Sequence, residues 1–423
     1  MDLRGQPERL VQVGADGEPT RYPADSYDGT GKGVDRSGFG RSSKVVPQEF
    51  KLLSLQKQWT RAFLYSEIIR ARSKRKAGTN MHIAAAIKSI IDGNNLTEEQ
   101  CYDAIYEVMS GEATDAQIAG LLIALRVKGE TVEEITGGAR ALAERANRIA
   151  PNVPLCVDPV GTGGDGTNTF NISSTAAIVA AAGGAYVAKH GNRCISSRSG
   201  SADFYEAIGI NIALTPKAVE KCIEEVGFGF MFAPNFHPAM RFAGPVRRQL
   251  AIRNIFNVLG PLSNPAGAKA QVLGVYDRKI MDYIAKTLQC LGEQHSLVVH
   301  GSDGSDEITN TGITYICEVR PDSIEEYTIT PEQFDMKRAT LDDIRGGTPE
   351  ENTGISMDVF RGKKGPHRDI VVLNAAATLY VAGMAPTLKE AVRLAGDTLD
   401  SGKALAKLEE IRKFTHREDI VNM

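Results

Sequence analysis

From residue 81 onward, hydrophobic residues recur every three or four positions, which is the period of amphipathic α-helices. The first stripe consists of isoleucines: Ile83, Ile87, Ile90 and Ile91. Thr97, with Gln100 three residues later, forms a capping box for a second helix. Thr114 and Thr131 begin a third and a fourth helix. The pattern predicts a small α-helical domain over residues 81–150.

After Pro151 the pattern changes to short β-branched runs separated by longer helical stretches. Strands are predicted at residues 156–158, 185–188, 272–275 and 296–300. Helices are predicted at residues 174–182, at 280–291 and from 371 onward. Residues 313–330 alternate as in an antiparallel pair. Because strand–helix alternation is typical of α/β domains with a mainly parallel sheet, we expect an α/β fold: the small helical domain, completed by some later helices, precedes a large α/β domain over residues 151–423.

Residues 1–80 differ from the rest of the chain. They are rich in Gly, Ser, Asp and Arg, and only residues 50–70 show helical spacing, so we expect a poorly structured extension with at most one helix. The extension holds 15 Lys and Arg against 9 Asp and Glu, although the whole chain has a net charge of -3. A basic cluster at residues 70–76 is typical either of a nucleic-acid contact or of a solvated linker, and we favour the linker.

Composition is that of a soluble globular protein, with 42% hydrophobic and 24% charged residues. No hydrophobic run approaches the roughly 20 residues that cross a bilayer, and the near-neutral charge gives no reason to expect a nucleic-acid or membrane partner. The six cysteines lack any C-x-x-C pair, which favours free thiols in a reducing compartment over zinc or disulfides. Because the N-terminus has no signal-peptide pattern, we expect a cytoplasmic protein.

A glycine-rich loop, Gly161-Thr162-Gly163-Gly164-Asp165-Gly166, follows the first predicted strand. Glycine lets backbone N–H groups converge on an anion without interference from Cβ atoms. Asn171, Ser173 and Ser174 lie where a helix begins, and a helix N-terminus also attracts phosphate. A tight turn would explain glycine alone, but the order of strand, loop and polar helix start predicts a phosphate site.

A second polar loop, residues 189–203, follows the second predicted strand and combines Lys189 and Arg193 with four serines. Cations and hydroxyls together neutralise and hydrogen-bond phosphate. A solvated loop is the alternative. The expected position at the carboxyl edge of the same sheet favours ligand binding.

Adjacent carboxylates, Asp306 and Glu307, follow a further predicted strand. Mg²⁺ prefers a few hard oxygen ligands together with the oxygens of a bound phosphate. Taken alone, such a pair is typical of surface loops, so it predicts a magnesium site only in combination with the phosphate site.

Two further residues have open roles. His237, which precedes Pro238, is either a catalytic or substrate-binding residue or a structural histidine. Arg247 pairs either with a substrate carboxylate, which it can bind bidentately, or with a carboxylate on the protein surface.

Together these segments resemble anthranilate phosphoribosyltransferase from about Met81 to the C-terminus. This family of the tryptophan pathway combines a small α-helical domain with a larger α/β domain. Its members are usually homodimers that join anthranilate to phosphoribosyl pyrophosphate, with Mg²⁺ and with release of pyrophosphate. The resemblance leaves open whether an anthranilate synthase partner is involved.

The resemblance implies residues for both substrates and for the metal. Phosphoribosyl pyrophosphate would contact Gly161, Gly164, Asp165, Thr169, Asn171, Ile172, Ser173, Ser174, Lys189, His190, Gly191, Asn192, Arg193, Cys194, Ile195, Ser196, Ser197 and Ser201. Anthranilate would contact Gly161, His190, Asn192, His237, Arg247 and Pro261. Mg²⁺ would be bound by Ser173, Asp306 and Glu307.

Such a reaction needs charge stabilisation and accurate placement of the amine rather than an activated protein nucleophile, and we assign no catalytic acid or base. The alternatives are an enzyme like the pyrimidine nucleoside phosphorylases, or a non-catalytic nucleic-acid-binding relative on the same fold. Two features depart from the family pattern. Residues 1–80 have no counterpart in the family core, and Asn254 replaces an expected threonine, away from the substrate motifs.

Overall fold

The computed structural model describes residues 81–193 and 198–423. The extension at residues 1–80, with its expected helix at 50–70 and its basic cluster at 70–76, lies outside the described residues. The same holds for four of the residues expected to contact phosphoribosyl pyrophosphate: Cys194, Ile195, Ser196 and Ser197.

The described chain begins with the four expected helices: α2 (Ile83–Ile91), α3 (Glu98–Ser110), α4 (Asp115–Lys128) and α5 (Val132–Glu144). The last three each start after a threonine whose side chain accepts a hydrogen bond from the third residue of the helix, in a complete capping box. The isoleucine stripe is confirmed at Ile83 and Ile90, which are buried. It is wrong at Ile91, which is 72% exposed, because successive helical residues are rotated by about 100°.

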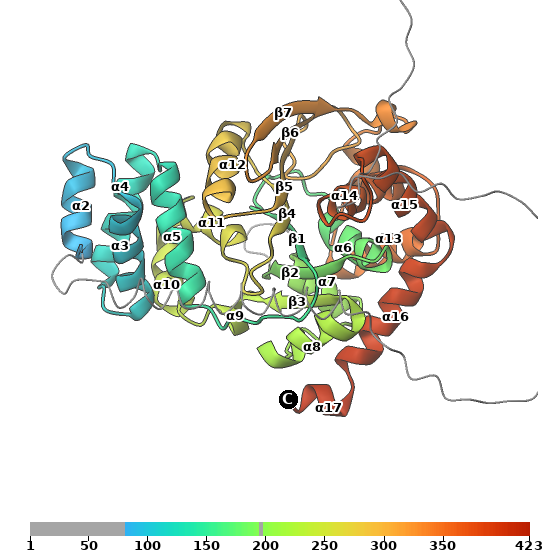
Figure 1. Cartoon of the computed structure of the whole chain (residues 1–423), viewed down its shortest axis with the longest axis horizontal. Coiled ribbons are helices and arrows are strands. Elements are labelled where there is room, and N and C mark those ends of the chain that lie inside the picture. Colours follow the sequence, from blue (N-terminus) through green and yellow to red (C-terminus); the bar gives the residue numbers. More distant parts are fainter. Residues whose placement is uncertain (1–80, 194–197) are drawn as a thin grey trace, which may run out of the picture. The chain divides into compact units, whose positions relative to one another are not determined.

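Helices α3 and α5 lie in close contact. They can approach each other because a glycine, Gly137, occupies the contact on α5. A Cβ atom added to Gly137 would lie 2.1 Å from the Glu98 carbonyl oxygen. Across the same contact the Tyr102 hydroxyl donates to Glu144 at 2.7 Å. Two later helices, α10 (Met240–Leu250) and α11 (Phe256–Leu259), pack against this group, and Figure 1 shows them between the first helices and the sheet.

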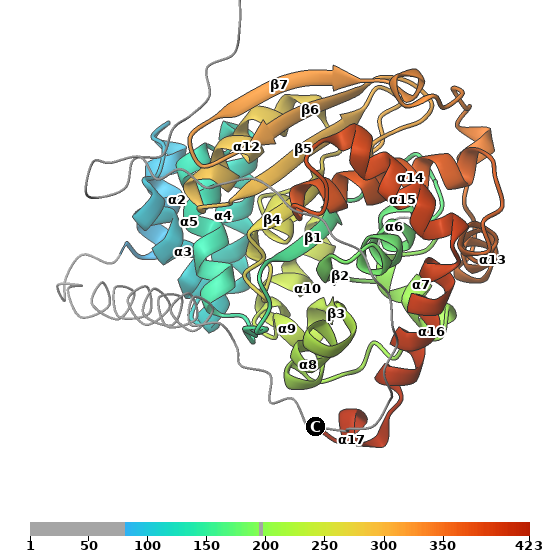
Figure 2. The same ribbon diagram turned by 45° about the vertical axis from the view of Figure 1, so that its right-hand side comes forward.

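The remaining chain forms a seven-stranded sheet in the order β3-β2-β1-β4-β5-β6-β7. The strands are β1 (Cys156–Gly161), β2 (Tyr186–Gly191), β3 (Phe228–Phe232), β4 (Ala270–Gly274), β5 (His295–Gly301), β6 (Thr314–Val319) and β7 (Ile324–Ile329). The first five pair in parallel, and β6 and β7 add an antiparallel edge (Figure 2). The mainly parallel sheet and its antiparallel excursion are confirmed.

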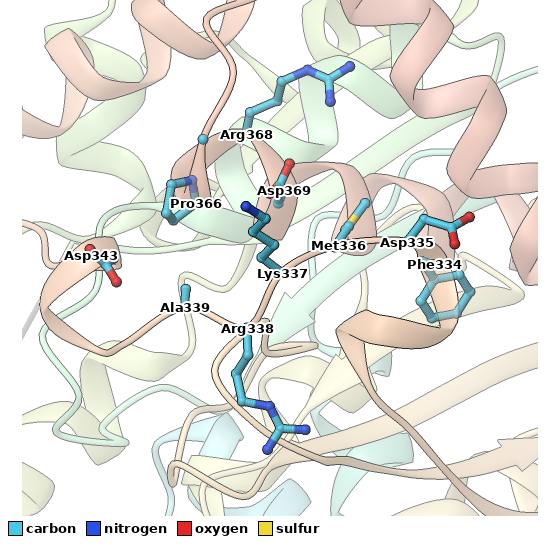
Figure 3. Close-up of a pocket in the computed structure, with 11 residues that line it drawn as sticks. Phe334, Asp335, Met336, Lys337, Arg338, Ala339, Asp343, Pro366, Arg368 and Asp369 are labelled. Carbon is cyan, nitrogen blue, oxygen red and sulfur yellow. The ribbon is translucent and has the colours of Figure 1, made fainter.

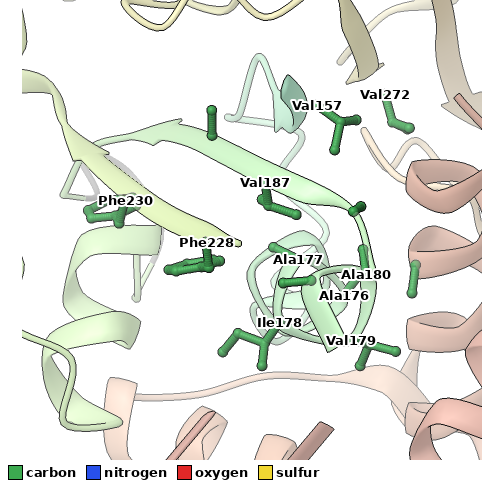
Figure 4. Packing of buried hydrophobic residues seen from close by; sticks show 14 of the residues in the cluster. Val157, Ala176, Ala177, Ile178, Val179, Ala180, Val187, Phe228, Phe230 and Val272 are labelled. Carbon is green, nitrogen blue, oxygen red and sulfur yellow. The ribbon is translucent and has the colours of Figure 1, made fainter. Parts of the chain in front are cut away.

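The helices around the sheet are α6 (Ile172–Ala182), α7 (Ser201–Ala207), α8 (Pro216–Val226), α9 (Ala233–Phe236), α12 (Met281–Cys290), α13 (Pro349–Phe360), α14 (Pro366–Val381), α15 (Leu388–Asp400), α16 (Lys403–Thr415) and α17 (Glu418–Val421). Helices α6 and α14 contact each other and the central strands, whereas α12 packs on the sheet beside α5. Helix α6 packs on β1 and β2 with a face rich in alanine, and Figure 4 shows Ala177 beside Val187. Among the described helices, none is both long enough and hydrophobic enough to cross a membrane.

The sequence pattern did not predict β3, nor the helices α7, α8, α9 and α13. The sequence of β3, Phe-Gly-Phe-Met-Phe, contains no β-branched residue. It forms a strand because it pairs in parallel with β2, in register from Val187 opposite Phe228 to Gly191 opposite Phe232. Pairing with β2 therefore fixes a segment whose phenylalanines favour a strand but whose glycine does not.

The contact between α3 and α5 yields a stability prediction. Gly137→Ala places a methyl group against backbone that cannot move aside, and we expect the free energy of unfolding to fall by about 1–3 kcal/mol in urea denaturation. Gly120→Ala in α4 is the matched control, because its nearest neighbour would be an Ile87 side-chain atom at 3.4 Å. That substitution should be neutral or slightly stabilising. Equal effects of the two substitutions would contradict the packing argument.

Candidate active site

The site lies where the strand order of the sheet reverses, between β1 and β4. From β1 the chain continues outward to β2 and β3, and it then returns to β4 on the other side of β1. Such a reversal opens a crevice beyond the carboxyl ends of the strands. The loops after β1, β2 and β5, which carry the three polar segments identified in the sequence, all begin at this edge.

The glycine loop packs directly against Asp306. The Gly163 N–H donates to Asp306 Oδ2 at 2.7 Å, and a Cβ atom on Gly161 would lie 2.4 Å from the same oxygen. A Cβ atom on Gly274, at the end of β4, would lie 1.6 Å from the Asp306 carbonyl oxygen. Glycine is therefore required at two strand ends so that the acidic segment can approach the loop.

The carboxylates of Asp306 and Glu307 lie beside the start of α6. Both are partly buried, and Glu307 Oε1 accepts from the Ser173 N–H at 3.1 Å. Burial raises the pKa of Glu307 to about 8, with Asp306 adding to the effect. Burial also raises the pKa of Asp306 to about 6, with Asp165 contributing. The alternative of a solvated surface pair is wrong.

Lys189 is the buried cation closest to these acids. It is 2% exposed, it donates to the Pro159 carbonyl, and its charge counteracts the raised pKa of both Asp306 and Glu307. One lysine faces three carboxylates here, because Asp165 also acts on Asp306. The cluster therefore has an excess of negative charge.

The oxygen atoms at this point fit a magnesium ion. A cavity of about 10 Å³ lies among Ser173, Asp306, Glu307 and Asn374, which is the room for about one water-sized particle. The described residues bring together no group of three or more His, Cys, Asp or Glu side chains that could hold a metal. A hard cation bound by few protein oxygens takes its remaining ligands from water and phosphate, so this donor set fits Mg²⁺ accompanied by a phosphorylated ligand.

The sequence pattern missed Asp158, which is fully buried in β1. Its carboxylate accepts from Asn264 Nδ2 at 2.7 Å and from the His190 N–H at 3.2 Å. Burial raises the pKa of Asp158 to about 6, and Lys189 opposes this. A single aspartate in a hydrophobic strand gives no recognisable signal, because its partners lie 32 and 106 residues away.

The residues at the start of α6 are held by contacts with other segments of the chain. Asn171 Oδ1 accepts from Ser199 Oγ at 2.9 Å and from Asn352 Nδ2 at 2.8 Å, and Thr169 forms an isolated β-bridge with Arg345. The side chains of Ile172 and Ser174 are buried. Helix α6 begins at Ile172, two residues before its predicted start, and this places Ser173 in the first turn, facing Glu307.

In the loop after β2, some polar groups bond within the loop and others bond to α7. Ser201 Oγ donates to the Asn192 carbonyl at 3.3 Å, and a Cβ atom on Gly191 would lie 2.2 Å from Ser201 Oγ. Arg193 forms ion pairs with Asp203 and Glu206, both at 2.8 Å. Its guanidinium is thus directed toward α7, and its contact with a phosphoribosyl group stays a prediction.

His190 and His237 form a buried pair with their ring centroids 4.9 Å apart. Burial lowers the pKa of His190 to about 3, helped by His237, and that of His237 to about 4, so both rings are neutral near pH 7. Nε2 of His190 and both ring nitrogens of His237 are buried without a hydrogen-bond partner among the described residues. Because buried polar atoms are nearly always paired, the pair is suited to a polar ligand.

Arg247 also has unused hydrogen-bonding capacity. Its guanidinium lies over the Phe256 ring, 5.4 Å from the centroid, and its Nε is buried without an acceptor. No ion pair to Arg247 occurs within residues 81–193 and 198–423, so the alternative of a surface salt bridge has no support there. Pro261, in the turn that follows α11, offers a carbonyl that accepts from Gln271 Nε2 at 3.3 Å.

A larger cavity, of about 540 Å³, lies elsewhere, between residues 334–343 and the start of α14 (Figure 3). It is lined by none of the residues identified in the sequence. Two of its cations are already paired, Arg338 with Glu332 and Arg368 with Asp400. We therefore assign the chemistry to the crevice beside β1 and β4.

Comparisons with known proteins point the same way. A model of the glycosyl transferase family, a/b domain, matches residues 153–405, and a model of its helical bundle domain matches residues 84–146. An anthranilate phosphoribosyltransferase of Acetivibrio thermocellus is 51% identical over 331 residues, which cover 78% of this chain and 96% of the relative. One of Methanosarcina acetivorans is also 51% identical, over 78% of this chain and 89% of the relative.

Solved structures agree with these matches. The anthranilate phosphoribosyltransferase of Thermus thermophilus superposes with a TM-score of 0.75 at 46% identity, over 78% of this chain and 99% of that one. The Saccharomyces cerevisiae enzyme, solved in complex with PRPP (phosphoribosyl pyrophosphate) and Mg, gives a TM-score of 0.73 at 27% identity, over 79% and 97% of the two chains.

The neutral state of the buried histidines leads to a pH prediction. The pKa of His237 is about 4 in the folded protein and about 6.5 in an unfolded chain, so below pH 6.5 the unfolded chain binds a proton that the folded protein does not. Stability is therefore lost as the pH falls, by about 1.4 kcal/mol per pH unit for this group. His237→Asn should remove about 2 kcal/mol of the loss between pH 7 and pH 5 in urea denaturation. Parallel curves for the variant and the wild type would refute this assignment.

Proposed function

The chain belongs to the anthranilate phosphoribosyltransferase family, and on that premise we propose that it transfers the phosphoribosyl group of phosphoribosyl pyrophosphate to the amine of anthranilate, with release of pyrophosphate. The observation that carries the proposal is the packing of the glycine loop against Asp306, beside Glu307 and the start of α6. This arrangement combines free backbone N–H groups, a helix N-terminus and hard oxygen ligands, as a magnesium diphosphate requires.

We assign the diphosphate end of the substrate to the glycine loop. Gly163 and Gly164 are exposed and have φ of +68° and +70°, a conformation that glycine adopts without strain. When bound by Ser173, Asp306 and Glu307, Mg²⁺ supplies electrostatic stabilisation of the departing pyrophosphate. The charge of Lys189 favours the ionised form of both acids, since it opposes the rise in the pKa of Asp306 and Glu307 that burial causes.

We assign the anthranilate end to Arg247 and the histidine pair. Arg247 carries a charge that no described carboxylate neutralises, which suits the carboxylate of anthranilate. His190 and His237 are neutral because burial lowers the pKa of each, so they present ring nitrogens to a polar ligand without adding charge.

In the reaction the anthranilate nitrogen forms a bond to the anomeric carbon of the ribose while the bond from that carbon to pyrophosphate breaks, and the proton that the amine loses passes to water or to the departing pyrophosphate. The protein contributes by orienting the two substrates and by stabilising the leaving group. No side chain needs to act as a nucleophile.

We also propose that the enzyme is a cytoplasmic homodimer. Helices α2 and α4 contact each other and leave three large aliphatic side chains exposed: Ile91 at 72%, Ile123 at 38% and Val127 at 82%. A second copy of the chain would remove this face from water. An anthranilate synthase partner stays open.

The activity itself is tested by the loss of anthranilate fluorescence in the presence of phosphoribosyl pyrophosphate and Mg²⁺. We expect turnover by the wild-type enzyme. Asp306→Asn should raise the Mg²⁺ concentration for half-maximal activity about tenfold or more, because one carboxylate ligand is lost. The control is Asp282→Asn, which breaks only an exposed pair with Lys286.

Failure of folded wild-type protein to consume anthranilate would refute the proposed function. Phosphorolysis of a pyrimidine nucleoside by the same sample would instead favour the nucleoside phosphorylase alternative.

The acceptor end is tested by Arg247→Ala. Removal of the carboxylate partner should raise the KM for anthranilate about tenfold or more and leave the KM for phosphoribosyl pyrophosphate nearly unchanged. Arg248→Ala is the control, because the neighbouring arginine is exposed. Equal increases in both KM values would exclude Arg247 from the anthranilate site.

A further inference from the structure

One arginine outside all the sequence motifs contacts the glycine loop. Arg253 lies in the segment between α10 and α11, away from the substrate motifs in the sequence. Its Nη2 donates to the Gly164 carbonyl. A Cβ atom on Gly164 would lie 3.1 Å from the same nitrogen, so the arginine packs against the loop as well as hydrogen-bonding to it.

The guanidinium of Arg253 stacks on the ring of Tyr276, which fixes its position. Its guanidinium carbon lies 3.6 Å from the centre of the tyrosine ring, within the range of a cation–π interaction. The Tyr276 N–H donates to Thr162 Oγ1 at 3.1 Å, and the Thr162 N–H donates to the Gly274 carbonyl at 2.9 Å. The glycine loop is thus held from the end of β4 at Thr162 and by Arg253 at Gly164.

The neighbouring residue explains how Arg253 reaches this place. Asn254 Oδ1 accepts from the Phe256 N–H at 3.2 Å, and the Asn254 N–H donates to Asn257 Oδ1 at 3.0 Å. These bonds fix the two residues that separate Arg253 from α11, and with them the backbone from which the Arg253 side chain extends. Asn254, the departure from the family pattern, is therefore a structural residue next to the site.

The hydrogen bond to Gly164 has a consequence for the next peptide group. In a trans peptide, the carbonyl of one residue and the N–H of the next point in opposite directions. When Arg253 holds the Gly164 carbonyl, the Asp165 N–H must point away from the arginine. Within the described residues no acceptor takes that N–H, so it is available to an anion.

We propose that Arg253 is a positioning residue that holds the glycine loop in its diphosphate-binding conformation before the substrate arrives. It acts through the Gly164 carbonyl and directs the Asp165 N–H toward the diphosphate. The identity of the ligand rests on the proposed function. The ordering of the loop does not, because it is a property of the chain without substrate.

Two measurements on Arg253→Ala test the proposal. The first is hydrogen exchange of the peptide covering residues 161–170 without substrate, which should become about tenfold faster in the variant because a charge-assisted hydrogen bond is lost. The second is steady-state kinetics, in which the KM for phosphoribosyl pyrophosphate should rise about tenfold while that for anthranilate changes little. Arg253→Lys should restore part of both effects, since lysine donates a hydrogen bond but stacks less well on tyrosine.

Arg248→Ala provides the matched control, and thermal melting identifies any variant that fails to fold. Unchanged exchange of residues 161–170, together with a raised KM, would overturn the proposal and make Arg253 a direct diphosphate ligand. An unchanged KM for phosphoribosyl pyrophosphate would also overturn it. If the wild type does not turn over, the proposed function fails, while the exchange measurement still reports whether Arg253 orders the loop.

As an independent check, Tyr276→Phe should leave the exchange of residues 161–170 unchanged, because phenylalanine keeps an aromatic face for the arginine. Tyr276→Leu removes that face and should accelerate the exchange in the same direction as Arg253→Ala. Equal exchange in the phenylalanine and leucine variants would show that stacking on Tyr276 does not position Arg253. The proposal would then lack the interaction that orients the arginine.

Discussion

The close approach of Asp306 to the ends of β1 and β4 is the constraint on which the site depends. The segment after β5 can reach the switch point of the sheet only because Gly161 and Gly274 lack a Cβ atom there. This approach lets the Asp306 carboxylate accept from Gly163, and it brings Glu307 to the start of α6. A methyl group at either strand end would separate the phosphate-binding loop from the metal-binding acids.

The approach also concentrates charge, which sets the electrostatics of the crevice. Asp158, Asp306 and Glu307 all have a raised pKa because they are buried, and Lys189 opposes the shift in each case. Burial in turn lowers the pKa of Lys189 itself, while these acids counteract that effect. A divalent cation would relieve the excess of negative charge at this site.

Much of the fold followed from local sequence pattern, because its causes are local. Thr97, Thr114 and Thr131 start helices through contacts with residues three positions later, and the valines of β1 and β5 favour strands. Strand β3 could not be predicted in this way, since its pairing with β2 is decided 41 positions away, as in Val187 opposite Phe228. Of the candidate site, the glycine loop and the acidic pair carried a signal of residue type and spacing, whereas the role of Asp158 depends on Asn264, 106 residues further along the chain.

Arg253 shows why the remainder of a site escapes sequence reasoning. An arginine in a connecting segment is ordinarily a solvated cation, and nothing in its immediate neighbours distinguishes it. Its role arises from three segments that meet at one sheet edge: the loop after β1, the start of α11 and the end of β4. A motif records residue type and spacing but not the direction of a peptide group. Arg253 binds the Gly164 carbonyl and so leaves the next N–H available to a ligand, and this role can be recognised only in three dimensions.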